Sequence, residues 1–335
     1  MTNSEHPFAP FIRTIGKGKT SQRSLTLGEA QQAMQMIMRG DVRPEQLGAF
    51  LMLLRVKEET SEELAGFTLA VRSTFALPEV NLDLDWPSYA GKRSQPPWYL
   101  LAALALANSG YRIVMHGSRG HTEGRVYSED VLRELDIAVA QQASDVEQHL
   151  QVSNFAFIPL QLINEQLQAL IELRPLLGVR TPVHSLCRLL NPFAAQASVQ
   201  SVFHPSYAPI HQGAAHLLGQ ANLVILKGDG GEFELRPHAD STLYRLSSHD
   251  ASETTISRVC ERADIQKLSV QRSAELLRAV WQADLGATTH TKQAQLAITG
   301  TIAAALHSLH PELTEKECHK KACYIWSIRA SVELD

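Results

Sequence analysis

The sequence has little that would mark a membrane protein or an extracellular disulfide scaffold. Its most apolar run, residues 100–108, is far shorter than the roughly 20 residues of a membrane-spanning helix. The first ten residues show no basic segment followed by an apolar core, so a secretory signal is not expected. The four cysteines have no framework spacing, which favours reduced thiols in a cytoplasmic protein.

The chain also lacks a strong excess of either charge. With 31 Lys and Arg against 35 Asp and Glu, the net charge is -4. This argues against a globally basic nucleic-acid binder and leaves a local basic groove open. No Ser-His-Asp order, dinucleotide glycine pattern or Walker loop occurs, and the cluster CHKKAC (318–323) has no standard zinc spacing.

What is present begins with helices. Thr26 with Glu29, and Thr60 with Glu63, have the spacing of a capping box, in which each residue satisfies a free N–H of the other. Pro44 suits the first position of a helix between them. Apolar residues follow each of these starts at three- and four-residue spacing, so we expect a small N-terminal helical domain, residues 1–80.

Beyond Pro78, short apolar strands alternate with helices. Strands are expected at 111–117, 155–159 and 221–230, and helices at 98–109, 128–135, 161–173, 207–218, 252–285 and 292–309. This alternation predicts an α/β fold with a mainly parallel central sheet flanked by helices. We expect this larger domain to comprise residues 81–159 and 196–335, joined to the first by hinge helices at about 160–195.

The most informative segment is RPLLGVRTPVHSLCRLLNPF, residues 174–193. It reads as a helix end, a turn at Gly178 and a second short helix stopped by a proline. Arg174 and Arg180 stand on either side of the turn, and guanidinium groups suit carboxylate or phosphate recognition. Taken alone, both arginines could equally be solvated surface charges.

In its order of residues this segment resembles the hinge of the anthranilate phosphoribosyltransferase family, which reads close to R-R-E-L-G-V-R-T-x-F-N-L-L-G-P-L-x-N-P. The departures are Pro175, His184 and the pair Cys187-Arg188. The resemblance implies a homodimer formed through the helical domain and transfer of phosphoribosyl from phosphoribosyl diphosphate, with Mg²⁺, to anthranilate or another amine or base. The matching residues are Arg174, Leu177, Gly178, Val179, Arg180, Thr181, Leu186, Leu189, Asn191 and Pro192.

The family's phosphate loop is largely replaced. Residues 87–92 stand over G-T-G-G-D-G, with only Gly91 retained, and residues 97–100 stand over N-I-S-T. Glycine loops bind phosphates through backbone N–H groups. The segment is therefore either a plain loop before a helix or a changed site, in which Lys92 and Arg93 bind phosphate and nearby aromatic residues stack on a base.

A second match is MHGSRGHTEGR, residues 115–125, against the family's K-H-G-N-R-S. His116 and Gly117 fall in register as cleft residues, and Arg119 as a phosphate contact. The alternative for His116 is a packed, hydrogen-bonded core histidine, and for Arg119 a surface charge.

The third match is LKGDGGEFELRP, residues 226–237, against the magnesium-binding H-G-x-D-G-L-D-E. Phe233 replaces the aspartate and Glu234 keeps the glutamate. Asp229 and Glu232 are nearby alternatives, because carboxylate oxygens are the natural Mg²⁺ ligands. A tight turn with solvated acids is the competing interpretation.

Three functions stay open on this evidence. The first is an active phosphoribosyltransferase. The second is a nucleic-acid-binding protein, because P-S-Y-x-G at residues 87–91 resembles a divergent nucleic-acid-binding branch of the family. The third is a sensor of a phosphorylated metabolite. The basic residues expected to contact nucleic-acid phosphates are Lys17, Lys19, Arg23, Lys92, Arg93, Arg119 and Arg125.

Overall fold

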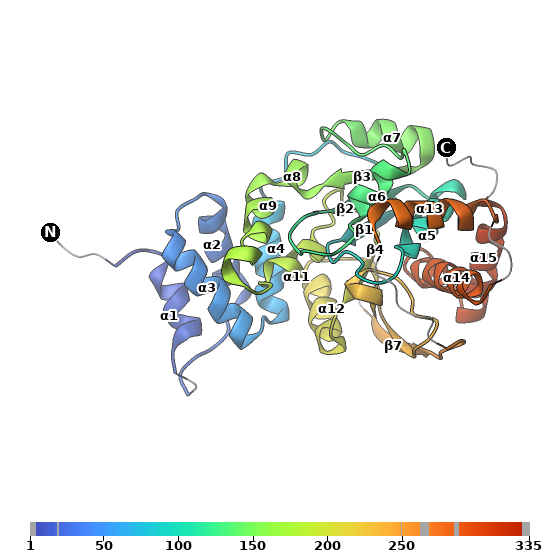
Figure 1. Cartoon of the computed structure of the whole chain (residues 1–335). Helices are drawn as coiled ribbons and strands as arrows, with labels where there is room; N and C mark the ends of the chain where they lie inside the picture. Colours follow the sequence, from blue (N-terminus) through green and yellow to red (C-terminus); the bar gives the residue numbers. More distant parts are fainter. Residues whose placement is uncertain (1–4, 19, 249, 262–267, 285–287, 330–335) are drawn as a thin grey trace.

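The computed structural model describes residues 5–18, 20–248, 250–261, 268–284 and 288–329 (Figure 1). It begins with four helices: α1 (Ala9–Gly16), α2 (Leu27–Met38), α3 (Pro44–Lys57) and α4 (Ser61–Arg72). The two predicted capping boxes are confirmed at the starts of α2 and α4, and Pro44 occupies the first turn of α3. Among the described residues, no helix combines the length and apolar character needed to cross a membrane.

The rest of the molecule is built around a seven-stranded sheet, in the order β3-β2-β1-β4-β5-β6-β7. The first five strands along the chain run parallel, and the last two are added antiparallel at one edge. This architecture confirms the predicted fold class. The strands are β1 (Leu84–Ser88), β2 (Ile113–Gly117), β3 (Phe155–Pro159), β4 (Ala197–Val202), β5 (Asn222–Lys227), β6 (Ser241–Ser247) and β7 (Asp250–Ile256).

Side chains that alternate along the strands pack into two separate hydrophobic cores. Ile113 and Met115 of β2 belong to one core, whereas Val114 between them belongs to the other, as the two-residue period of a strand requires. The first core is covered by five helices, which lie on one side of the sheet in Figure 1. They are α5 (Trp98–Asn108), α6 (Ser128–Glu134), α13 (Val270–Trp281), α14 (Thr289–Leu309) and α15 (Glu315–Ser327).

The second core joins the sheet to the N-terminal helices. Phe50 and Phe67 of the helical part share a buried cluster with Val114 and Ile158 of the sheet. A third, smaller cluster packs α4 against α12 (Ala208–Leu217) and β5. The remaining helices of this side are α7 (Asp145–Ser153), α8 (Leu160–Ile163), α9 (Glu165–Glu172), α10 (Arg174–Leu177) and α11 (Val183–Leu186).

Four strands differ from the sequence prediction. The helix expected over residues 252–285 is wrong at its start, because Asp250–Ile256 is the edge strand β7 and α13 begins only at Val270. Strands β1, β4 and β6 were not predicted at all. The helix expected over 161–173 is interrupted at Asn164, whose side chain caps α9 by accepting from Leu167 N.

The hinge segment folds as predicted. Helix α10 ends at Gly178, whose φ of +76° is the left-handed conformation that glycine adopts most readily at a helix end. Helix α11 and a 3-10 turn, Cys187–Leu189, then follow. The boundaries proposed for the two domains and the dimer through the helical part stay predictions. The four cysteines are free thiols, of which Cys187 and Cys318 are buried.

Candidate functional site

The loops after four parallel strands meet at one edge of the sheet. Strands β1, β2, β4 and β5 are neighbours and point the same way, so the segments after Ser88, Gly117, Val202 and Lys227 gather there. This is the edge at which open α/β sheets bind ligands. The edge contains two distinct groups of charged side chains, which we call the loop latch and the hinge cleft.

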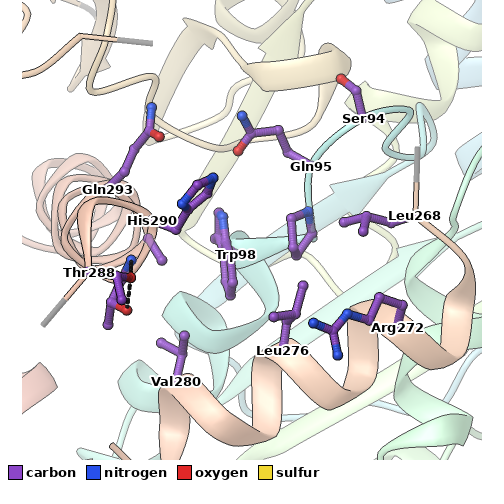
Figure 2. A pocket seen from close by; sticks show the side chains of 13 residues that line it. Ser94, Gln95, Trp98, Leu268, Arg272, Leu276, Val280, Thr288, His290 and Gln293 are labelled. Carbon is purple, nitrogen blue, oxygen red and sulfur yellow. Dashed lines mark hydrogen bonds between the residues drawn. The ribbon is translucent and has the colours of Figure 1, made fainter. Parts of the chain in front are cut away.

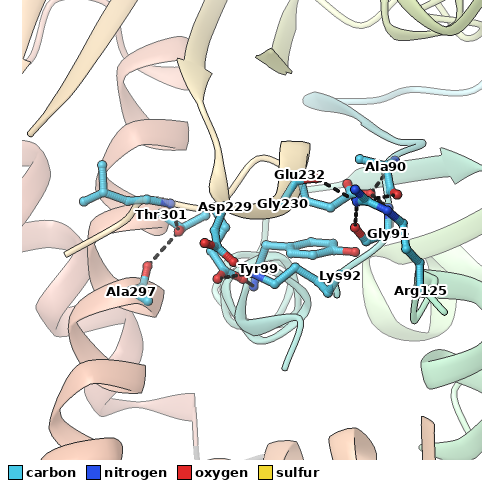
Figure 3. Close-up of polar contacts among 12 residues, drawn as sticks. Ala90, Gly91, Lys92, Tyr99, Arg125, Asp229, Gly230, Glu232, Ala297 and Thr301 are labelled. Atoms are coloured by element: carbon cyan, nitrogen blue, oxygen red, sulfur yellow. Dashed lines mark hydrogen bonds and ion pairs between the residues drawn. The ribbon is translucent and has the colours of Figure 1, made fainter. Parts of the chain in front are cut away.

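The loop latch joins the segment after β1 to the segment after β5 (Figure 3). It comprises Lys92, Asp229, Glu232 and Glu234. The Oε1 atom of Glu232 accepts hydrogen bonds from Ala90 N at 2.7 Å and Gly91 N at 2.6 Å. Paired backbone amides of this kind are anion sites, and here the chain's own carboxyl group fills one. Gly91 has a φ of +69°, a conformation that favours glycine.

The ammonium group of Lys92 lies between two acids of the latch. Lys92 Nζ contacts Asp229 Oδ2 and lies 2.6 Å from Glu234 Oε1, and the lysine is 1% exposed. Burial works to lower the pKa of Lys92, but the two carboxylates outweigh it and raise that pKa. Burial raises the pKa of Glu234 to about 7 against the opposing pull of Lys92. The pKa of Asp229 is lowered, because the charge of Lys92 overcomes the effect of burial.

Two further groups hold the latch closed. Arg125 Nη1 donates to three carbonyls, Ala90 O at 3.1 Å, Gly91 O at 2.7 Å and Gly230 O at 3.0 Å, and so ties both loops together. The backbone N–H of Tyr99, at the start of α5, donates to Glu234 Oε2 at 2.9 Å. Arg125 and the N–H of Tyr99 thus both find acceptors within the chain.

A magnesium ion does not fit the latch as it stands. Both acids that could ligate it, Asp229 and Glu234, are already paired with Lys92. Within the described ranges, no group of three or more His, Cys, Asp or Glu side chains could hold a metal ion. The Lys92 ammonium thus occupies the position in which a cation would meet these carboxylates.

The hinge cleft differs because cations predominate in it: among the described residues, the buried Glu59 is the one acid that lines its cavity. It contains Arg125, Arg174, Arg180 and Arg188, and a cavity of about 250 Å³ borders three of them. Their hydrogen bonds go to neutral oxygens: Arg174 Nη1 donates to His121 O at 2.7 Å, Arg180 Nη2 to Ala90 O at 3.4 Å and Arg188 Nη1 to His184 O at 2.6 Å. In the described part of the chain, none of the four forms an ion pair with a carboxylate.

Mutual repulsion is visible in the pKa values of the cleft. Burial and the neighbouring arginines lower the pKa of Arg180 to about 10. Burial, Arg180 and Arg174 likewise lower the pKa of His121 to about 3, and burial with His121 and Arg180 lowers that of His184 well below its usual value. Both imidazoles are therefore neutral at physiological pH, and the arginines carry the cleft's positive charge.

Several buried polar atoms beside these arginines lack hydrogen-bond partners. They are His121 Nε2, His184 Nε2, Arg174 Nε, Thr181 Oγ1 and Glu232 Oε2. Buried polar groups are nearly always satisfied, so a cluster of exceptions calls for water or a ligand. The exceptions and the unpaired positive charge coincide in the hinge cleft.

The predicted cleft residues lie in two different environments. Arg174 and Arg180 belong to the cleft, but His116 is fully buried in the sheet, where it contacts Tyr89 Oη at 2.7 Å and Asp85 Oδ1 at 3.1 Å. This is the packed histidine of the alternative interpretation. Gly117 stands where an added Cβ would lie 2.3 Å from Ser88 O, so its role is close approach of two strands.

The residues predicted to contact phosphate or nucleic acid also lie in different environments. Arg93 is exposed, whereas Lys92 is enclosed in the latch. Arg119 pairs with Asp130 at 3.0 Å, and Arg23 pairs with Glu29 at 2.6 Å. Lys17 is exposed after α1, and Lys19 lies outside the described residues.

Sequence reasoning missed Arg188 and His121, both of which line or border the cleft. Arg188 was visible as a departure, because it stands in place of the Gly-Pro of the family hinge. His121 also stands at a departure from the family pattern, but only the fold brings its loop against α10 and α11.

Comparison with protein families gives two matches that together cover most of the chain. Residues 9–75 match the helical bundle domain of a glycosyl transferase family, and residues 99–322 match that family's a/b domain. The chain is 26% identical over 280 residues to anthranilate phosphoribosyltransferase of Bacillus subtilis, which covers 81% of each protein. It is 32% identical over 200 residues to that of Desulfitobacterium hafniense, which covers 59% of each.

Solved structures show the same fold at lower identity. Anthranilate phosphoribosyltransferase from Thermus thermophilus superposes with a TM-score of 0.78 at 22% identity, covering 98% of this chain and 96% of the other. The enzyme from Saccharomyces cerevisiae, in complex with PRPP and Mg, gives 0.80 at 17% identity, covering 98% and 95%. The chain therefore belongs to the glycosyl transferase family represented by the anthranilate phosphoribosyltransferases.

Proposed function

We propose that this chain binds a phosphate-bearing ligand in the hinge cleft and does not transfer phosphoribosyl from phosphoribosyl diphosphate. One observation carries the proposal, namely that the loop latch is filled by the chain's own charges. Glu232 accepts from the amides of Ala90 and Gly91, where a diphosphate would bind, and Lys92 pairs with Asp229 and Glu234. A diphosphate–magnesium complex would have to displace Glu232 and Lys92 and break four hydrogen bonds or ion pairs.

Catalysis in this class of reaction depends on positioning and electrostatic stabilisation of the leaving group. Both need free amides and an accessible cation at the phosphate loop. The latch offers neither, because its donors already have internal acceptors. The family resemblance therefore explains the fold and the hinge, while the latch argues against the family's reaction.

The hinge cleft supports a ligand that carries negative charge. Its arginines present guanidinium groups that suit phosphate, and their partners are only carbonyl and hydroxyl oxygens. At the mouth of the same cavity lies Phe203, which is 50% exposed, next to His204 and Tyr207. Cationic groups beside an exposed aromatic ring are typical of sites for single-stranded nucleic acid, where phosphates pair and bases stack. We therefore propose single-stranded nucleic acid as the ligand.

The test is titration of the purified protein into a labelled oligonucleotide, followed by fluorescence anisotropy at several salt concentrations. We expect a dissociation constant of about micromolar or below that rises steeply with salt, because phosphate pairing releases counterions. Arg180→Gln should weaken binding and lower the salt slope by about one. Arg133→Gln, which removes an exposed arginine of α6, is the matched control and should change little. Salt-insensitive binding, or none at all, contradicts the nucleic-acid proposal.

A second candidate is an active phosphoribosyltransferase, favoured by the similarity to anthranilate phosphoribosyltransferases over about four fifths of the chain. Growth of a tryptophan-requiring strain that lacks this enzyme separates the two. Rescue by the unmodified chain would support the second candidate. Failure of a well-expressed chain to rescue, together with no heat of binding for phosphoribosyl diphosphate and Mg²⁺ in calorimetry, would support the first.

A further inference from the structure

A separate cavity lies on the other side of the loop that leads into α5. It has a volume of about 290 Å³ and is enclosed by the loop at residues 94–96, by α13 and by the first turns of α14. It shares no lining residue with the hinge cavity. Its volume is at the small end of natural ligand pockets, which measure about 300–1,000 Å³.

The interior of this cavity is apolar and includes a flat ring. Figure 2 shows Trp98 at the centre, with Leu276 and Val280 of α13 below its indole. Trp98 and Val280 are almost fully buried, whereas Leu276 is only partly covered. A cavity lined by an aromatic ring and aliphatic side chains favours a planar apolar ligand, since ring stacking adds to the area removed from water.

The opposite wall carries polar side chains that can form hydrogen bonds. His290 and Gln293 stand three residues apart on α14, so they lie on the same face of the helix, and Gln95 approaches from the loop (Figure 2). Imidazole and amide groups can each donate and accept. They match the edge of a heteroaromatic ring, which has both a ring N–H and a ring nitrogen acceptor.

The charges around the cavity further restrict the class of ligand that it can bind. Among the described residues no acid lines the cavity, and the permanent charge that they place there, on Arg272, is paired with Glu275 at 2.8 Å. A cationic ligand would therefore find no counter-charge, and a strongly anionic one would compete with Glu275. A neutral ligand leaves this pair intact.

We infer that this cavity is a binding site for a neutral, planar heteroaromatic molecule of one or two rings, held between Trp98 and the His290–Gln293 edge. The site goes beyond the nucleic-acid proposal, because it uses none of the hinge arginines. It lies directly behind the loop latch: Trp98 borders the cavity, and the next residue, Tyr99, donates its N–H to Glu234. A ligand in the cavity would therefore contact Trp98, whose neighbour Tyr99 donates a hydrogen bond to the latch.

Benzimidazole is a suitable probe because it is flat, bicyclic and has one ring donor and one ring acceptor. The measurement is the ¹H–¹⁵N spectrum of the tryptophan indoles in the full chain, with the Trp98 signal assigned from Trp98→Phe. We expect a saturable shift at Trp98 that exceeds the shifts at Trp86, Trp281 and Trp326. Naphthalene-2-methanol, which has the shape but not the ring edge, should bind about tenfold more weakly.

Four variants make the result decisive. Leu276→Trp fills the cavity and should abolish the shift, whereas Leu217→Trp, at a partly exposed position of α12, should retain it. His290→Ala should weaken benzimidazole about tenfold and leave the naphthalene alcohol unchanged, and it keeps the test valid should Leu276→Trp fail to fold. Arg180→Gln should leave the shift intact, which separates this site from the hinge cleft. No saturable shift at Trp98, or a shift that survives Leu276→Trp, overturns the inference.

Discussion

The loop latch and the hinge cleft are adjacent, and both are rich in charge, but their charges are arranged in opposite ways. In the latch, Lys92 lies between Asp229 and Glu234, and Glu232 accepts from two amides. In the cleft, four arginines crowd together and none of them forms an ion pair among the described residues, although Glu59 lines the cavity and Glu232 acts electrostatically on Arg188. The charges that pair with one another in the latch contribute to the stability of the fold. The cleft arginines, which have no ion-pair partner, can still gain free energy by pairing with a ligand.

Under the proposed function, the family's phosphate loop would be closed to its ligand while the hinge would still bind one. The latch stands where the family's phosphate loop and metal-binding acids align, and the cleft stands on the family's hinge. One lysine and one glutamate are enough to close the first, because buried ion pairs are costly to break. The hinge has no such internal partner, and it gained Arg188.

The largest effect should come from breaking the latch. Lys92→Met leaves Asp229 and Glu234 buried without a cation, and removing one partner of a buried pair costs about 3–5 kcal/mol of unfolding free energy. Urea denaturation measures this loss. Millimolar Mg²⁺ should restore part of it for the variant and none for the parent, because two facing carboxylates without lysine become a cation site.

Arg93→Met is the matched control, because it removes an exposed cation from the next position along the chain. Its cost should stay below about 0.5 kcal/mol, as for most surface substitutions. Equal stability of the two variants would show that the latch is not a stabilising element and would remove the contrast with the cleft.

The second effect should appear in the cleft, with the opposite balance of binding and stability. Arg180→Gln should weaken oligonucleotide binding by about 1.5–3 kcal/mol, the typical value of a hydrogen bond to a charged group. Its unfolding free energy should be unchanged or slightly higher, because the substitution relieves repulsion from Arg188, Arg125 and Arg174. Anisotropy and urea denaturation on the same samples measure both. A loss of stability without a loss of binding would make Arg180 a structural residue.

A smaller effect is expected at the mouth of the cleft. Phe203→Ala should weaken binding by about 1–3 kcal/mol if a base stacks on this half-exposed ring, and the salt slope should not change, because no phosphate contact is lost. Tyr324→Ala, which removes a ring that is 63% exposed on α15, serves as the control. A changed salt slope for Phe203→Ala would argue against stacking.

The smallest effect concerns pH. Burial, with a contribution from Arg188, lowers the pKa of His211 to about 3, against a usual value near 6.5. Below pH 6.5 the unfolded chain therefore binds a proton at His211 that the folded chain does not bind. The contribution of His211 to the free energy of unfolding is complete above pH 6.5 and is lost as pH falls. Between pH 6.5 and 5.5 this costs about 1 kcal/mol. His211→Gln should lose about that much less over the same interval in urea denaturation, and an unchanged pH dependence would contradict the burial argument.

The sequence predicted those elements whose signals are local. Capping boxes at Thr26 and Thr60 and the apolar strands β2, β3 and β5 could be read directly. Strand β1 was missed because it contains Asp85 and Pro87. The aspartate is satisfied by His116 and Ser198, and the proline is tolerated because pairing with β4 ends at Asp85.

Strands β4 and β7 were hidden by polarity for different reasons. In β4, the side chains of Ser201 and Gln200 are buried but hydrogen-bonded to Gly231 O and His211, so a core strand reads as a loop. Strand β7 lies at the sheet edge with most of its residues exposed, and therefore lacks the apolar alternation of a half-buried strand.

The sequence by itself determined the family and the hinge, because the order of residues from Arg174 to Pro192 and the helix caps are local patterns that need no fold to be recognised. Only the tertiary structure decided which charges are free. Lys92 lies 137 residues from Asp229 and 142 from Glu234 along the chain. Electrostatic energy depends on separation in space and on burial rather than on position in the sequence. The same lysine that reads as a phosphate ligand in the sequence is therefore the internal cation of the latch.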